Sequence, residues 1–146
     1  MNFIVKTFDK LSIQQFFEIY KLRNAVFVVE QNCAYQDVDE KDPKAYHILM
    51  MMGETLAGYC RILPAGVSYP QPSIGRVVID KEFRGKDLGK ELMKFSISKT
   101  LDLFKNQDIV ISAQTYLLKF YSDLGFKAEG AEYLEDDIPH IKMRYT

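Results

Sequence analysis

The sequence has 146 residues, of which 47% are apolar, 27% charged and 13% aromatic, a composition typical of one globular domain. Its 19 basic and 20 acidic residues give a net charge of −1, without the basic surplus that marks most nucleic-acid-binding domains. The sequence has only two cysteines, without zinc-ligand spacing, which argues against a disulfide scaffold and a metal site. It has no apolar run of about 18 residues and no apolar leader, which argues against a membrane span and export. We therefore expect one cytoplasmic domain over residues 1–146 with no nucleic acid, membrane or metal among its partners.

The first predicted elements are a strand over residues 2–8 and a helix that begins after Ser12. Ser12 and Gln15 have the spacing of a capping box. Apolar side chains then recur at i, i+3, i+4 and i+7 from Ile13 to Tyr20, which predicts one apolar helical face. The apolar pattern continues to Val29, either as a second helix or as a bent continuation of the first.

The rest of the chain alternates strands and helices. It reads as an acidic loop over 36–44, a hairpin of strands 45–52 and 56–63, a strand over 73–80, a helix over 88–104, a strand over 109–113, a helix over 116–124 and strands over 126–131 and 141–145. The order β-αα-ββ-β-α-β-α-ββ predicts an α/β fold of the α+β kind, built around a mixed sheet.

The connection between the strand 73–80 and the helix 88–104 carries the clearest sign of chemistry. Residues 84–89 form a glycine-containing basic turn that opens directly into the helix, and residues 81–94 hold five cations against three acids. Free backbone N–H groups and the positive end of the helix dipole meet at such a turn, which makes it an anion site suited to a diphosphate. A solvated, charged βα connection would look the same, so the turn alone does not decide between the two.

Several motifs resemble one known family. Arg84-Gly-Lys-Asp-Leu-Gly89 resembles the Arg/Gln-x-x-Gly-x-Gly/Ala signature of the GNAT acetyltransferase superfamily, and Phe120-Tyr-Ser-Asp-Leu-Gly-Phe126 resembles its Tyr-x-x-Leu-Gly-Phe segment. More narrowly, residues 22–143 are similar to the ElaA-like branch. The matching pieces are Leu22-Arg-Asn-Ala-Val-Phe-Val-Val-Glu-Gln31, Tyr35-Gln-Asp-Val-Asp39, His47, Ile74-Gly-Arg-Val77, Ala113-Gln114 and Glu135-Asp-Asp-Ile-Pro-His140.

This resemblance implies a GNAT fold and an acyltransferase that moves an acetyl group from acetyl-coenzyme A (acetyl-CoA) to an amine of a small molecule, peptide or protein. It places Tyr121 as the acid that protonates the departing thiolate, and the backbone of residues 77–79 as the group that polarises the thioester carbonyl. The cofactor-binding residues that it implies are Val77, Val78, Ile79, Arg84, Gly85, Lys86, Asp87, Leu88, Gly89, Lys90, Gln114 and Tyr121.

The catalytic base is less well defined, with Glu30, His47 and His140 as candidates. Histidine has a suitable pKa for proton transfer near neutrality, although a histidine beside apolar strand residues is more often a hydrogen-bonded structural residue. Three arginines in apolar stretches also need carboxylate partners, for which Glu30 and the acidic loop are available. These arginines are Arg23, Arg61 and Arg76.

Two positions depart from the family pattern. Asp87 and Asp137 stand where glycine is usual. Aspartate tolerates the left-handed backbone region better than most residues, but the Asp87 carboxylate would repel a diphosphate unless Arg84, Lys86 or Lys90 offset it.

Two alternative functions stay open. Parts of the sequence also resemble acyl-homoserine-lactone synthases, although those proteins are longer. The resembling residues are Arg23, Phe27, Asp37, Asp39, Asp42 and Arg61-Ile-Leu-Pro64. Asp87 instead favours a non-catalytic coenzyme-A-binding or interaction module. The sequence specifies neither the acceptor amine nor the oligomeric state, so a homodimer also stays open.

Overall fold

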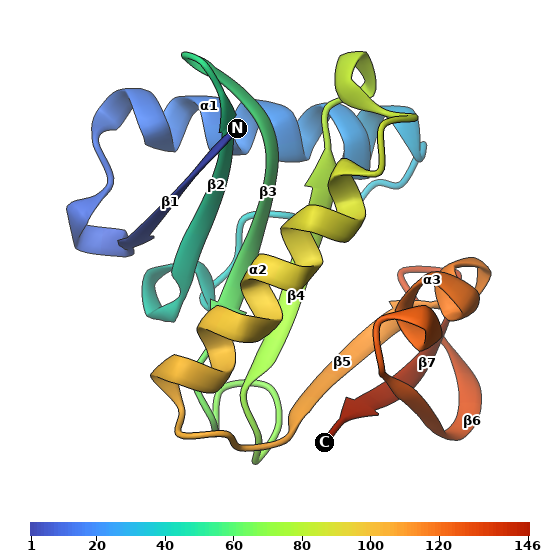
Figure 1. Ribbon diagram of the computed structural model, residues 1–146. Coiled ribbons are helices and arrows are strands. Elements are labelled where there is room, and N and C mark those ends of the chain that lie inside the picture. Colours follow the sequence, from blue (N-terminus) through green and yellow to red (C-terminus); the bar gives the residue numbers. More distant parts are fainter.

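The computed structural model describes residues 1–146 and has the predicted order of elements (Figure 1). Its main helices and strands are β1 (Asn2–Thr7), α1 (Ile13–Arg23), β2 (Tyr46–Met52), β3 (Thr55–Leu63), β4 (Ser73–Ile79), α2 (Leu88–Leu103), β5 (Ile109–Gln114), α3 (Leu118–Asp123), β6 (Lys127–Glu135) and β7 (Ile138–Tyr145). The α/β fold class predicted from the sequence is therefore confirmed.

Helix α1 begins at the predicted capping box. The Ser12 hydroxyl accepts a hydrogen bond from the Gln15 N–H at 3.0 Å, and the Gln15 side chain accepts one from the Ser12 N–H at 2.9 Å. The helix runs on without a break into a π-helical segment, Asn24–Glu30. Of the two alternatives that the sequence left open, the structure therefore has the continuation of the first helix.

The strands form two antiparallel sheets, whereas the sequence predicted a mixed sheet. Their orders are β1-β2-β3-β4 and β5-β7-β6. Strands β4 and β5 start together, where the Val110 N–H donates to the Pro72 carbonyl at 3.0 Å, and then diverge (Figure 1). A bulge in β4 accompanies the divergence: Arg76 and Val77 stand opposite Cys60 alone, and Arg76 has a φ of 51°. Because a bulge bends its strand, β4 cannot keep parallel pairing with β5 along its length.

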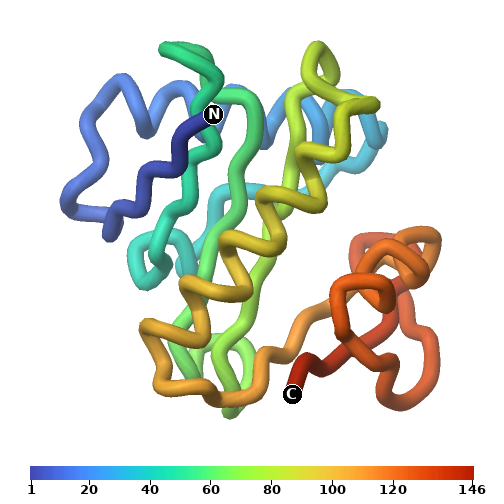
Figure 2. The backbone as a smooth tube through the Cα atoms, in the orientation of Figure 1, coloured from blue at the N-terminus to red at the C-terminus, as the bar shows by residue number.

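Both faces of the first sheet are covered, with α2 crossing one face and α1 lying against the other (Figure 2). Alternate side chains of β2 pack on opposite faces of this sheet. Ile48 and Met50 pack on the α2 side, and Leu49 packs on the α1 side. Tyr121, Met143 and Phe126, from the C-terminal part of the chain, join the α2-side cluster, so both sheets share one core. No helix here is both long enough and apolar enough to span a membrane.

Candidate active site

The turn before α2 offers a row of free backbone donors. The first hydrogen bond of α2 runs from the Glu91 N–H to the Asp87 carbonyl at 3.3 Å, and the N–H groups of residues 85–90 reach no acceptor in the protein. Gly85 and Asp87 both have positive φ, of 80° and 57°, which turns the chain sharply into the helix. Six consecutive free N–H groups at the start of a 16-residue helix form an anion site.

The charges around this turn are only partly balanced. The Arg84 guanidinium donates two hydrogen bonds to the Glu30 carboxylate, at 2.7 and 2.9 Å, and its Nε donates to the Ile79 carbonyl at 3.2 Å. The hydrogen bonds from Arg84 lower the pKa of Glu30. Lys86 and Lys90 are exposed and form no ion pair, so two cations remain available to an anion.

Beside the turn, the divergence of β4 and β5 leaves an open strand edge. The Asp80 N–H donates to the Ala57 carbonyl on β3 at 2.8 Å. Successive N–H groups of a strand point to opposite edges, so the Ile79 N–H points away from β3, toward the gap. A pocket fills this gap, and its lining includes Ile79, Arg84, Gly89, Gln114, Phe120 and Tyr121. We call it the donor pocket.

A second pocket lies on the other side of the same gap, and we call it the acceptor pocket. Its lining includes Tyr35, Arg76, Ser112, Glu135 and His140. The two pockets share six lining residues and therefore adjoin each other. The shared residues are Phe27, Gln31, Val77, Gln114, Leu117 and Tyr121.

Tyr121 stands at this junction. It is only 7% exposed, and its ring packs edge-on against Phe120 and Phe126. Burial raises the pKa of its hydroxyl, which is therefore fully protonated at neutral pH. The structure thus brings the predicted residues Tyr121 and Gln114 together at the meeting point of the pockets.

Among the three base candidates, only His140 lines the acceptor pocket. It lies on β7 opposite Gln114 of β5 and is buried. Its Nδ1 lies 2.7 Å from the Ile138 carbonyl. A carbonyl can only accept, so Nδ1 carries a proton and donates it to this carbonyl, which leaves Nε2 as the ring nitrogen available to a ligand. Nε2 lies 3.5 Å from a carboxylate oxygen of Glu135, a residue that the sequence analysis quoted in a motif but did not place in the site.

The other two base candidates lie elsewhere. Glu30 lines the donor pocket, but Arg84 occupies its carboxylate. His47 is fully buried and lines neither pocket. Its Nε2–H donates to the Asp42 carbonyl at 3.0 Å, and its Nδ1 accepts from the Tyr59 hydroxyl at 2.7 Å. Because burial also lowers its pKa, His47 is a neutral, hydrogen-bonded structural residue.

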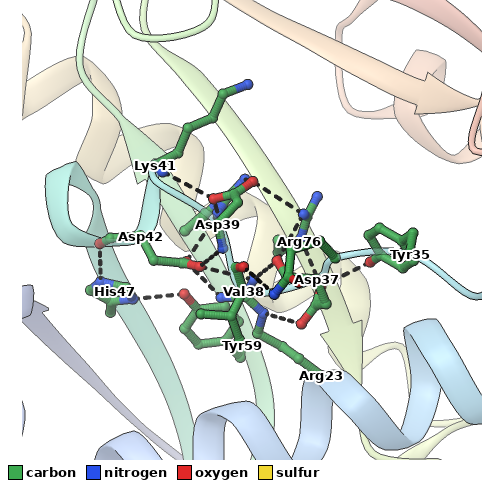
Figure 3. A network of polar contacts seen from close by, with 12 residues as sticks. Arg23, Tyr35, Asp37, Val38, Asp39, Lys41, Asp42, His47, Tyr59 and Arg76 are labelled. Carbon is green, nitrogen blue, oxygen red and sulfur yellow. Dashed lines mark hydrogen bonds and ion pairs between the residues drawn. The ribbon is translucent and has the colours of Figure 1, made fainter.

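His47 borders a buried ion cluster that gives the three arginines their predicted partners (Figure 3). Arg23 has no exposed side-chain surface and binds Asp37 at 3.0 Å and Asp42 at 2.7 Å. The partners come from the acidic loop, whereas Glu30 serves none of the three. The charges of the ion cluster balance, because it contains three guanidinium groups and three carboxylates. They belong to Arg23, Arg61, Arg76, Asp37, Asp39 and Asp42.

The ion cluster also shapes the acceptor pocket. Arg76 Nε lies 2.9 Å from an Asp37 carboxylate oxygen, and the Arg76 guanidinium stacks over the Tyr35 ring. Both residues line the pocket together with Cys33. The cluster therefore fixes the loop after α1 against the bulge of β4. No group of three or more His, Cys, Asp or Glu side chains is arranged to hold a metal ion.

Comparisons with known proteins agree with this geometry. Residues 9–146 match the acetyltransferase (GNAT) domain family. The chain is 38% identical over 137 residues to the protein ElaA of Escherichia coli, covering 92% of this chain and 90% of ElaA. The crystal structure of Escherichia coli ElaA superposes with a TM-score of 0.92, over 99% of both chains.

Two further structures place the fold. An acyl-CoA N-acyltransferase from Pseudomonas aeruginosa is 36% identical and superposes with a TM-score of 0.93 over 100% of both chains. The AHL synthase LasI is only 18% identical, with a TM-score of 0.77 over 98% of this chain and 89% of LasI, and this likeness concerns the fold alone. The domain match and the identity to ElaA together show that the chain belongs to the GNAT acetyltransferase superfamily, in its ElaA-like branch.

Proposed function

We propose that the protein is an acetyl-CoA-dependent N-acetyltransferase that acetylates an amine of a small molecule, peptide or protein. One observation carries the proposal: Tyr121, a buried and protonated phenol, lines both the pocket beside the anion-binding turn and the pocket across from it. A group in this position can touch a donor and an acceptor that enter from opposite sides. Membership of the family and the likeness to an acyl-CoA N-acyltransferase support the same function.

The residues around the donor pocket fit a coenzyme A thioester. Six free N–H groups over residues 85–90, with Lys86 and Lys90 nearby, suit its diphosphate. The open edge of β4 offers amide groups to the extended pantetheine arm, and Gln114 faces this edge from β5. The Ile79 N–H is the donor that we assign to polarising the thioester carbonyl.

We assign the two proton transfers of the reaction to Tyr121 and His140. Tyr121 donates its proton to the thiolate as the carbon–sulfur bond breaks, since a phenol and a desolvated thiolate exchange protons readily. His140, whose Nδ1 is bound to the Ile138 carbonyl and whose Nε2 is therefore the nitrogen available to a ligand, is the group that we assign to accept a proton from the amine.

The substitution Tyr121→Phe tests this assignment. We expect kcat to fall about 100-fold or more because the general acid is lost. The dissociation constant for acetyl-CoA should stay within about twofold, because the ring and its packing are retained. Thiol release with an amine panel measures kcat, and calorimetry measures binding. Tyr46→Phe is the matched control, because Tyr46 packs edge-on against Phe104 and lines neither pocket.

Other outcomes point to the alternatives. Equal losses in turnover and in acetyl-CoA affinity would contradict the acid role of Tyr121. Binding of acetyl-CoA without turnover across the whole panel would favour a non-catalytic module. Acyl transfer to S-adenosylmethionine, included in the panel, would favour an activity like that of the acyl-homoserine-lactone synthases.

A further inference from the structure

The acceptor pocket has features that specify its ligand more closely than any amine. Building on the proposed function, we propose that Glu135 binds the acceptor as an ammonium ion, and that the acceptors are primary alkylamines without a carboxylate beside the amine.

The charged side chains that line the pocket leave a negative surplus. They are Arg76, Glu135 and Asp136. The charge of Arg76 is already balanced by Asp37 and Asp39, which lie outside the lining. Glu135 contacts no lysine or arginine, so the lining holds two acidic residues, Glu135 and Asp136, without a lysine or arginine that balances them. Such a field attracts an ammonium group and repels an acceptor that carries a carboxylate next to its amine.

The Glu135 carboxylate is held in place by neutral groups. It accepts a hydrogen bond from the Ser112 hydroxyl at 3.1 Å, and Ser112 in turn is hydrogen-bonded to the Tyr133 hydroxyl. Glu135 also ends β6 where a two-residue turn, Asp136 and Asp137 with φ of 51° and 62°, leads back into β7. A carboxylate that is oriented, about half exposed and without a lysine or arginine partner keeps acceptor capacity for an incoming N–H donor.

Beside His140, this carboxylate can assist the deprotonation of the ligand. The nearest charged partner of Nε2 is Glu135, at 3.5 Å, so a proton taken by Nε2 forms an imidazolium next to a carboxylate. Of the three protons of the bound ammonium, one passes to His140 and then to water. The amine nitrogen then attacks the thioester carbonyl and the carbon–sulfur bond breaks. A second proton reaches the thiol by way of Tyr121, and the third stays on the amide product.

Kinetics of the variant Glu135→Gln test the inference. We expect KM for a primary alkylamine to rise about 10-fold or more, while KM for acetyl-CoA stays within about twofold. For an alkoxyamine, which is neutral at pH 7.5, the rise in KM should be less than about threefold, because a neutral acceptor makes no ion pair with Glu135 that the substitution could remove. Glu132→Gln is the matched control: Glu132 lies exposed on the same strand, makes no ion pair and lines neither pocket.

A binding measurement without acetyl-CoA separates this inference from the proposed function. The chain has two histidines, so their ring protons give two assignable NMR signals. Titration with butylammonium should shift the His140 signal, leave that of buried His47 unmoved, and shift neither in Glu135→Gln.

The outcomes are distinct. An unperturbed His140 signal, or active enzyme whose alkylamine KM is unchanged in Glu135→Gln, overturns the ammonium site while leaving acetyl transfer intact. A shifted signal without acetylation of any amine supports the site and counts against the proposed function. Faster acetylation of glycine than of glycinamide would overturn the exclusion of a neighbouring carboxylate.

Discussion

Asp87 combines two properties that oppose each other at the anion-binding turn. Its backbone adopts φ 57° and ψ 22°, the left-handed region where glycine is usual, so it supports the sharp turn into α2. Its exposed side chain caps no backbone group and forms no ion pair, so an uncompensated negative charge stands beside six free N–H donors. The residue thus maintains the geometry of the turn and weakens its electrostatic attraction for phosphate.

Replacing Asp87 separates these two effects. We expect Asp87→Gly to tighten acetyl-CoA binding about 3- to 10-fold, because a like charge is removed and the left-handed conformation is retained. Asp87→Asn is the control: asparagine also tolerates this conformation, so a purely electrostatic effect gives the same gain in both variants. Isothermal calorimetry measures the affinities. Unchanged or weaker binding in both variants would contradict the electrostatic role given to Asp87.

At the scale of elements, the Glu30–Arg84 ion pair connects the π-helical end of α1 with the turn before α2. Both terminal nitrogens of the Arg84 guanidinium, Nη1 and Nη2, donate to the Glu30 carboxylate, although both side chains are about half exposed. In the proposed function, the diphosphate of the donor would bind the same guanidinium. The pair therefore competes with the proposed ligand for Arg84.

The variant Glu30→Gln should release this competition. We expect acetyl-CoA to bind about 1.4- to 5-fold more tightly, because an exposed ion pair contributes roughly 0.2–1 kcal/mol. The gain should shrink at high salt, where such pairs are screened. Glu18→Gln on α1 is the matched control, because Glu18 pairs with Lys21 far from the turn in sequence and lines neither pocket. Weaker binding of acetyl-CoA would instead show that Glu30 holds Arg84 in its binding position.

The elements that the sequence predicted correctly depend on neighbours along the chain. The capping box at Ser12 and the basic turn over 84–89 each lie within a few residues, so local patterns suffice to identify them. The bulge at Arg76 depends on how β4 pairs with β3, which no local pattern encodes. For the same reason, the division into two sheets was missed. The acceptor pocket collects Arg76, Ser112 and Glu135 from three distant segments, and the sequence had not indicated any of these three as pocket residues, although it had indicated Val77, Gln114, Tyr121 and His140.

The last hairpin was predicted too short, with its strands ending at 131 and starting at 141. In the structure β6 extends to Glu135 and β7 begins at Ile138. Nearly every side chain of β6 is exposed, so the strand lacks the alternation of buried and exposed residues that would reveal it. Its partner β7 determines its length instead, and Glu135 was therefore not recognised as a pocket residue.

For the whole molecule, the ion cluster determines how the loop after α1 is attached to the rest of the fold. Arg23 comes from α1, Arg61 from β3 and Arg76 from β4, and the loop over 37–42 supplies all their carboxylates. Buried arginines left without their carboxylates are costly, so the loop and these three elements are stable only together. The wall of the acceptor pocket thus depends on carboxylates that must stay ionised.

This dependence predicts acid sensitivity. Burial alone would raise the pKa of Asp39, but hydrogen bonds and charge from Arg61, the Lys41 N–H and Arg76 lower it to about 2. Despite its burial, Asp42 likewise has a lowered pKa because of Arg23. A carboxyl with a depressed pKa in the folded state adds stability above its unfolded pKa, near 3.9, and loses it as the pH falls toward the folded value.

We therefore expect the free energy of unfolding to decrease between about pH 5 and pH 2, with Asp39 alone accounting for about 2 kcal/mol. Asp39→Asn should be less stable at pH 7 and should lose correspondingly less on acidification, because the titrating group is gone. Glu40→Gln is the control, since Glu40 is exposed and forms no ion pair, and its pH dependence should follow the wild type. Urea unfolding at pH 7, 5, 4 and 3 measures the slopes. Parallel curves for the wild type and Asp39→Asn would mean that the Asp39–Arg61 pair does not underlie the acid sensitivity.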